Sequence, residues 1–136
     1  MTYLVDANVL SELTKTAPDR RTIDWLRQHE AEMAVDPIVL GELQFGILLL
    51  AQGKRRSVLE RWFDEAVRRL HCLAWDSDTG LEWAALVARL RRAGAAMPIK
   101  DSLIAASALH HGLTVATRNV ADFKRAGVKT VNPFAG

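Results

Sequence analysis

Cysteine is nearly absent from this chain, because Cys72 is the single cysteine among 136 residues. One cysteine cannot form an internal disulfide or supply a cysteine zinc site, which fits a reducing compartment. Apolar runs are short as well, and no stretch approaches the roughly 18 apolar residues that a membrane span needs. The N-terminus lacks a basic region followed by an apolar segment, so we expect no signal peptide, no membrane association and a cytoplasmic location.

Neither sign of charge dominates, since the formal net charge is +2, with 18 Lys and Arg residues against 16 Asp and Glu residues. Apolar residues make up 49% of the chain, as in a globular protein. The length predicts one domain over residues 1–136. If several acids gather in one pocket, the remaining surface is more basic than the net charge indicates, which favours a phosphate-bearing partner. Ordinary solvated helix faces explain the same charge equally well.

Short β-type segments alternate with helical segments along the chain. Apolar and β-branched runs predict strands at residues 2–5, 32–35, 72–75, 113–117 and 128–131. Apolar periodicity and capping residues predict helices at residues 9–14, 18–29, 38–51, 54–70, 79–93 and 98–111, and a loop or short helix at 118–123. This alternation predicts an α/β fold, a three-layer sandwich in which helices flank a mostly parallel central sheet.

The first strand ends in a carboxylate, because the apolar residues 3–5 are followed directly by Asp6. In open α/β sheets, ligands bind in the crevice at the carboxyl ends of the strands. A carboxylate beside apolar walls is costly unless it is paired or binds a cation. Asp6 is therefore the first candidate site residue.

Two further acids begin helical faces. Glu42 shares its face with Phe45, Gly46 and Leu49, and such a glutamate points either towards the core or, from the rim of the face, into solvent. Asp101 begins a face rich in small residues, and its alternative role is that of an ordinary acid in the first turn of a helix. The coincidence of these acids with Asp6 favours one shared site.

Polar residues follow the strand expected at 113–117. Asp122 is a fourth candidate ligand, Asn119 and Thr117 are candidates for orienting a carboxylate or a water, and ordinary turn chemistry is the alternative for all three. Arg118 either contacts a phosphate or pairs with one of the acids.

Three or four carboxylates that meet within a few ångströms raise one another's pKa, and a divalent cation removes this conflict. Ligands that are all oxygen select a hard ion such as Mg²⁺ or Mn²⁺ rather than Zn²⁺. An ion of this kind can activate a water and stabilise the charge on a phosphodiester during an in-line displacement. The residues thus predict a metal-dependent phosphodiesterase.

Three segments together resemble the PIN-domain ribonucleases, and within them the VapC and FitB-like toxins of bacterial toxin–antitoxin pairs. The segments are YLVDANVLSEL at 3–13, LGELQFG at 40–46 and PIKDSLIAASALHHGLTVATRNVADF at 98–123. The last is the most specific, and NPF at 132–134 resembles the usual end of these proteins. The middle of the chain, from about residue 53 to 95, matches in pattern only.

The resemblance implies a Mg²⁺- or Mn²⁺-dependent endoribonuclease that cuts RNA, with Asp6, Glu42 and Asp101 as its acidic core and Asp122 as the fourth acid. Asn119 and Thr117 take supporting roles. It also implies a homodimer that is silenced by a small VapB-like antitoxin reaching into the active-site groove. The apolar turn at residues 47–50 is the segment we expect to contact a second chain, either in the dimer or in the antitoxin complex.

Other functions are compatible with parts of this pattern. A housekeeping PIN nuclease that processes structured RNA, or a PIN scaffold that binds a partner or nucleic acid without catalysis, would share the fold. A haloacid-dehalogenase-type phosphatase needs a second Asp where this chain has Asn8. The sequence also departs from many relatives at Asp36, where a Ser is usual; we expect a turn residue there rather than an extra acid of the pocket.

Overall fold

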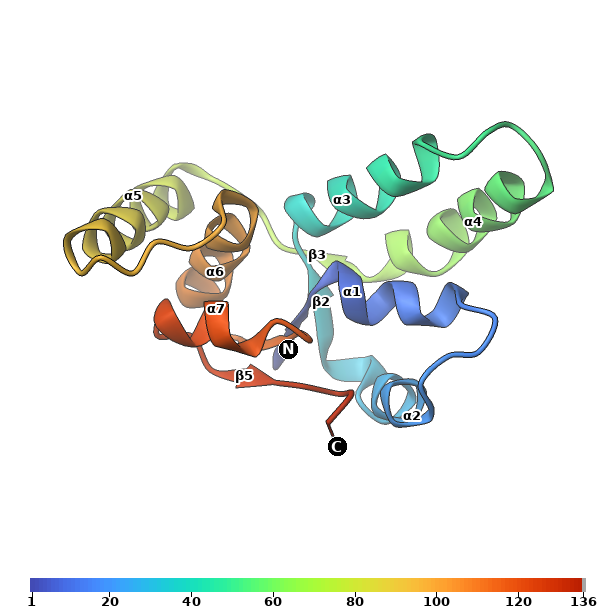
Figure 1. Cartoon of the computed structure of the whole chain (residues 1–136), viewed down its shortest axis with the longest axis horizontal. Helices are drawn as coiled ribbons and strands as arrows, with labels where there is room; N and C mark the ends of the chain where they lie inside the picture. Colours follow the sequence, from blue (N-terminus) through green and yellow to red (C-terminus); the bar gives the residue numbers. More distant parts are fainter. Residues whose placement is uncertain (136) are drawn as a thin grey trace.

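The computed structural model describes residues 1–135, in which helices cover both faces of a five-stranded sheet (Figure 1). Neighbouring strands are parallel throughout, and their order across the sheet is β3-β2-β1-β4-β5. The expected three-layer α/β fold with a parallel sheet is confirmed. The strands are β1 (Tyr3–Val5), β2 (Met33–Val35), β3 (His71–Cys72), β4 (Thr114–Ala116) and β5 (Thr130–Val131).

The helices fall into two groups because the chain reverses its direction across the sheet between β3 and β4. Right-handed crossovers then place α1 to α4 on one face and α5 to α7 on the other, as Figure 1 shows. No helix within residues 1–135 is both long and apolar enough to cross a bilayer. The helices are α1 (Ala7–Leu10), α2 (Arg20–Gln28), α3 (Pro37–Leu48), α4 (Lys54–Glu65), α5 (Ser77–Arg92), α6 (Ile99–His111) and α7 (Val120–Arg125).

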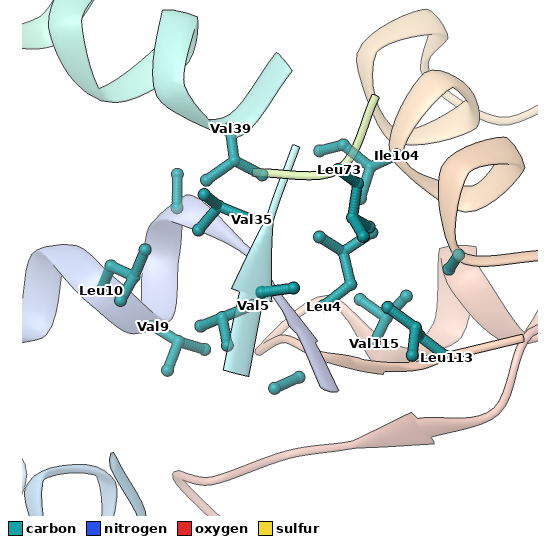
Figure 2. Packing of buried hydrophobic residues seen from close by; sticks show 14 of the residues in the cluster. Leu4, Val5, Val9, Leu10, Val35, Val39, Leu73, Ile104, Leu113 and Val115 are labelled. Atoms are coloured by element: carbon teal, nitrogen blue, oxygen red, sulfur yellow. The ribbon is translucent and has the colours of Figure 1, made fainter. Parts of the chain in front are cut away.

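The core surrounds β1, whose alternating side chains serve both faces of the sheet. Val5 points towards Val9 and Leu10 of α1, whereas Leu4 lies on the side of Ile104 in α6 (Figure 2). Leu4 and Val5 are both fully buried. From β1 the chain continues to β2 and β3 on one side, and β4 and β5 lie on the other side of β1. The carboxyl ends of β1 and β4 therefore form the crevice where such sheets bind ligands.

The ends of several elements differ from the sequence-based expectation. The third strand is His71–Cys72 rather than 72–75, the fourth is Thr114–Ala116 and the fifth is Thr130–Val131. The segment expected to be a loop or short helix contains α7. The first helix, expected at 9–14, starts at Ala7 because Asp6 caps it, and its last turn is the 3₁₀ segment η1 (Ser11–Thr14).

The helix expected at 54–70 is two elements. Its α-helical part ends at Glu65, and a 3₁₀ turn, η3 (Val67–Arg69), follows. Val58 in the helix is 56% exposed, and Phe63 is its buried residue. Val67 in the 3₁₀ turn is buried as well.

Gly112 ends α6 in the left-handed conformation, with φ 68° and ψ 36°. Replacing Gly112 with Ala should destabilise the protein by about 1 kcal/mol, because a Cβ disfavours this backbone conformation. Gly46 is the matched control, since it lies inside α3 and an added Cβ there meets nothing within 4 Å. Its replacement with Ala should be neutral or stabilising. Urea unfolding of both variants measures the difference; equal effects would contradict the assigned end of α6.

Candidate functional site

Asp6 lies at the carboxyl end of β1, 4% exposed, and its carboxylate accepts hydrogen bonds through both oxygens. The backbone N–H of Ala7 donates to Oδ1 at 2.8 Å, which caps α1. The hydroxyl of Thr117 donates to Oδ2 at 2.8 Å, and the amide of Asn8 donates to the same oxygen at 3.3 Å. Because Thr117 follows β4, two neighbouring strand ends fix the orientation of Asp6.

Asn119 joins two other acids of the predicted site. Its side-chain amide donates to Oδ2 of Asp101 and to Oδ2 of Asp122, both at 2.8 Å. Its backbone N–H donates to the hydroxyl of Thr117 at 2.9 Å. A continuous set of hydrogen bonds therefore links Asp6, through Thr117 and Asn119, to the acids of α6 and α7.

Glu42 of α3 is bound by a lysine that the sequence analysis did not single out. Nζ of Lys100, at the start of α6, donates to Oε2 of Glu42 at 2.8 Å. The other carboxylate oxygen, Oε1, is buried and has no hydrogen-bond partner among the described residues. Glu42 thus combines one neutralised oxygen with one unsatisfied acceptor.

Burial dominates the electrostatics of the site. It is the main reason that the pKa of Asp6 rises to about 6; the hydrogen bonds from Thr117 and Ala7 oppose the rise, and the charges of Glu42 and Asp101 add to it. Burial also raises the pKa of Asp101 above its usual value, against the opposing charge of Lys100. These acids act on one another's ionisation, so they share one electrostatic environment.

The sequence predicted a buried apolar face beside Glu42, and this prediction was wrong. Phe45 on that face is 62% exposed and Leu49 is 70% exposed. The buried face of α3 consists instead of Val39, Leu43 and Ile47. The α3 helix is apolar on nearly every side, so periodicity gave no guide to its inward face.

The corresponding argument for Asp101 was sound. Ile104, Ala105 and Ala108 on its face are fully buried, while Leu109 is 37% exposed. The small side chains let α6 approach the sheet closely, which brings the first turn of the helix towards the strand ends. Asp101 itself is 8% exposed.

Asp36 is a capping residue rather than an exposed acid at the rim of the pocket. Its Oδ1 accepts the backbone N–H of Val39 at 2.9 Å and so begins α3. The residue is fully buried, and burial raises its pKa to about 6. The expected turn role therefore holds, but full burial of this carboxylate was not anticipated.

Arg118 is held at the edge of the site by three contacts. Its backbone N–H donates to Oδ1 of Asn8 at 3.1 Å, and its guanidinium lies 3.7 Å from the ring centre of Phe134. The guanidinium is also 4.0 Å from Oε1 of the buried Glu12. The sequence left two roles open for Arg118, contacting a phosphate or pairing with one of the predicted acids. The acid that it neighbours, Glu12, is not one of the four predicted acids. Its side chain is 54% exposed, so an anion can reach it.

Lys100 and Asn8 are the residues that sequence reasoning missed. Lys100 directly precedes Asp101, so a basic residue beside a candidate ligand was the only available signal. Asn8 was considered as the position where a phosphatase needs a second Asp, yet it contacts both Asp6 and the backbone of Arg118. The contact of Lys100 with Glu42 joins residues 58 positions apart, and the contact of Asn8 with Arg118 joins residues 110 positions apart.

The carboxylate oxygens of Asp6, Glu42, Asp101 and Asp122 suit a hard divalent cation. The buried, unpartnered Oε1 of Glu42 is an acceptor that a cation would satisfy. Within residues 1–135, however, no three acidic, His or Cys side chains are already arranged to hold one ion. Lys100 and the amide of Asn119 instead bind the carboxylates that the ion would contact.

Comparison with known proteins agrees with this geometry. Residues 3–129 match the PIN domain family. The chain is 34% identical to a VapC ribonuclease, Y4jK, of Sinorhizobium fredii, over 96% of both proteins. It is 32% identical to the toxin FitB of Neisseria gonorrhoeae, over 96% of this chain and 97% of FitB. A structure of FitAB bound to an IR36 DNA fragment superposes with a TM-score of 0.88 at 28% identity, over 98% of this chain and 96% of that one.

The chain therefore belongs to the PIN-domain family of nucleases. Its full-length similarity to Y4jK and FitB groups it with the VapC and FitB-like toxins, which confirms the resemblance drawn from the sequence. PIN-domain ribonucleases in general depend on a divalent metal ion, which fits the oxygen-rich site.

The raised pKa of Asp6 predicts an unusual gain in stability on neutralisation. The folded protein binds this proton more tightly than the unfolded chain, whose ordinary value is 3.8. Asp6 therefore favours folding fully below about pH 4 and loses this contribution as the pH rises through about 6. Without metal, Asp6→Asn should be more stable than the wild type at about pH 7.5, by on the order of 2 kcal/mol.

Urea unfolding in EDTA at several pH values measures this effect. The advantage of the variant should shrink as the pH falls from about 6 to about 4 and vanish below that, where Asp6 becomes protonated in the unfolded chain as well. Asp36 has a similar pKa but is present in both proteins, so its effect cancels. A stability difference that does not change with pH would contradict the buried, raised-pKa environment of Asp6.

Proposed function

We propose that this protein is the toxin of a VapBC-type toxin–antitoxin pair and a Mg²⁺- or Mn²⁺-dependent endoribonuclease that acts in the cytoplasm. The observation that carries this proposal is the hydrogen-bonded connection from Asp6 through Thr117 and Asn119 to Asp101 and Asp122. The names of its full-length relatives, a VapC ribonuclease and the toxin FitB, support the same activity.

The residues of the site have separate tasks in this proposal. Asp6, Asp101 and Glu42 hold the metal ion, and Asp122 contributes directly or through a water. Thr117 and Asn119 keep two of the carboxylates oriented, as their hydrogen bonds indicate. When bound, the ion activates the attacking water and stabilises the negative charge that develops on the phosphodiester.

Arg118 is assigned to the RNA backbone. Its guanidinium lies flat against Phe134, so its orientation is set before a substrate arrives, and about half of its side chain is exposed. A guanidinium can form paired hydrogen bonds with a phosphate. This contact holds the RNA at the edge of the crevice without selecting a base sequence.

The partner proteins in this proposal are a VapB-like antitoxin and a second copy of the chain. An apolar surface on α3 consists of Phe45, Leu48 and Leu49, which are 62%, 51% and 70% exposed. The same helix carries Glu42, which also lines a cavity of about 370 Å³ with Asn8 and Trp62. An antitoxin docked along α3 would therefore reach the acids and block RNA.

The metal assignment predicts that Asp6→Asn and Asp101→Asn abolish RNA cleavage, because each removes a ligand charge. Thr117→Val should retain more activity, with a loss of about 10- to 100-fold, since it removes only the hydrogen bond that orients Asp6. Incubation of labelled RNA with Mg²⁺ or with EDTA measures these effects. The products should carry a 5′-phosphate, because water attacks the phosphorus and the 3′-hydroxyl leaves.

Asp24→Asn is the matched control for these variants, since Asp24 is an exposed aspartate of α2 that pairs only with Arg20. It should cleave like the wild type. Undiminished turnover by Asp6→Asn would refute the site, and products ending in a 2′,3′-cyclic phosphate would refute attack by water.

The apolar surface of α3 predicts that Leu49→Glu weakens antitoxin binding while RNA cleavage by the free protein persists. A charge cannot be buried at such an interface without a partner. Leu81→Glu on α5 is the control, because Leu81 is equally exposed, at 70%. Copurification with a VapB-like antitoxin tests this; retained binding by Leu49→Glu would exclude α3 as the docking surface.

A further inference from the structure

The ion pair between Lys100 and Glu42 places a protein cation at the acidic site. The two residues come from different helices, α6 and α3, and their charged atoms are 2.8 Å apart. The side chain of Lys100 is 52% exposed, and that of Glu42 is 29% exposed. The contact therefore links α6 to α3, with Lys100 partly in solvent and Glu42 close enough to raise the pKa values of Asp6 and Asp101.

Stability alone gives a poor account of this contact. A partly exposed ion pair contributes about 0 to 1 kcal/mol to folding. Meanwhile Oε1 of the same Glu42 is buried without a partner, which is unfavourable. A carboxylate placed mainly to hold Lys100 would not leave its second oxygen unsatisfied. The arrangement is better explained if Oε1 of Glu42 binds a second positive charge.

Lys100 occupies one of the carboxylate oxygens that a metal ion would use. Its ammonium contacts Oε2 of Glu42, and Asp101 is the next residue in the chain. An ammonium and a divalent ion cannot share the same oxygen lone pairs, and they repel each other at short distance. A metal ion that uses Glu42 must therefore either displace Lys100 from Oε2 or bind at Oε1 against the repulsion of the ammonium, and both lower its affinity.

We propose that Lys100 is a positioning residue that acts as the built-in counter-ion of Glu42: it neutralises this carboxylate in the metal-free protein and competes with the divalent ion for it. The inference rests on the proposed metal-dependent function. Competition of this kind lowers metal affinity, so the site loads and releases its ion more readily than the acids alone would allow.

Calorimetric titration of the metal-free protein with Mn²⁺ tests the proposal, at constant ionic strength. Lys100→Met should bind Mn²⁺ up to about fivefold more tightly than the wild type, because the ion no longer competes with the ammonium for Glu42. Lys100→Arg should keep an affinity close to that of the wild type, since an arginine can replace the ammonium. Lys129→Met, which removes an exposed lysine of the 126–130 segment, should also bind like the wild type.

A second titration separates the direct contact from the general effect of charge. In the Glu42→Gln background, Lys100→Met should no longer strengthen Mn²⁺ binding, because the carboxylate for which the two cations compete is gone. An equal gain in both backgrounds would overturn the proposal, since Lys100 would then act only through its long-range field. Unchanged or weaker Mn²⁺ binding by Lys100→Met would overturn it as well.

The failure of this inference differs from the failure of the proposed function. If Lys100→Met binds Mn²⁺ with the affinity of the wild type while Glu42→Gln binds it more weakly, only the role of Lys100 is lost. If neither the wild type nor Lys100→Met binds Mn²⁺, the metal-dependent nuclease is lost and the inference with it. Circular dichroism verifies folding, and Lys100→Gln replaces the methionine variant if that variant does not fold.

Discussion

A carboxylate buried at the end of the central strand costs free energy, and the site is arranged around this cost. Asp6 sits where β1 meets β4, because strand order reverses there and opens a crevice. Three hydrogen bonds, from Ala7, Asn8 and Thr117, hold its oxygens in place. They do not neutralise its charge, and neighbouring acids make ionisation still harder. A cation is the remaining way to lower the energy of the group.

The structure satisfies this demand in part with its own groups. The amide of Asn119 bridges two acids, and the ammonium of Lys100 neutralises a third. These contacts orient the carboxylates, but they also occupy some of the carboxylate oxygens. A site built in this way orients its carboxylates without metal and leaves Oε1 of Glu42 free for a cation, which suits a nuclease whose activity depends on an ion from solution.

Sequence reasoning performed unevenly on the acids for identifiable reasons. Asp101 was placed correctly because α6 has one clearly buried face of small residues. Glu42 was assigned to the site from the wrong face of its helix, because α3 is apolar on nearly every side and its exposed side carries Phe45 and Leu49. Its assignment was supported by resemblance to the family rather than by periodicity. Lys100 was missed, since nothing in its local sequence shows which carboxylate it meets.

The sequence by itself determined the order of the strands and helices along the chain, the class of fold and the family, because these follow from apolar patterning, helix caps and short motifs. It also indicated the four candidate acids, since residue type and position at strand and helix ends are local properties. Only the tertiary structure decided which groups bind which carboxylate: Thr117 with Asp6, Asn119 with Asp101, and Lys100 with Glu42. Such pairings depend on distances between segments far apart in the chain, and local patterns contain no information about them.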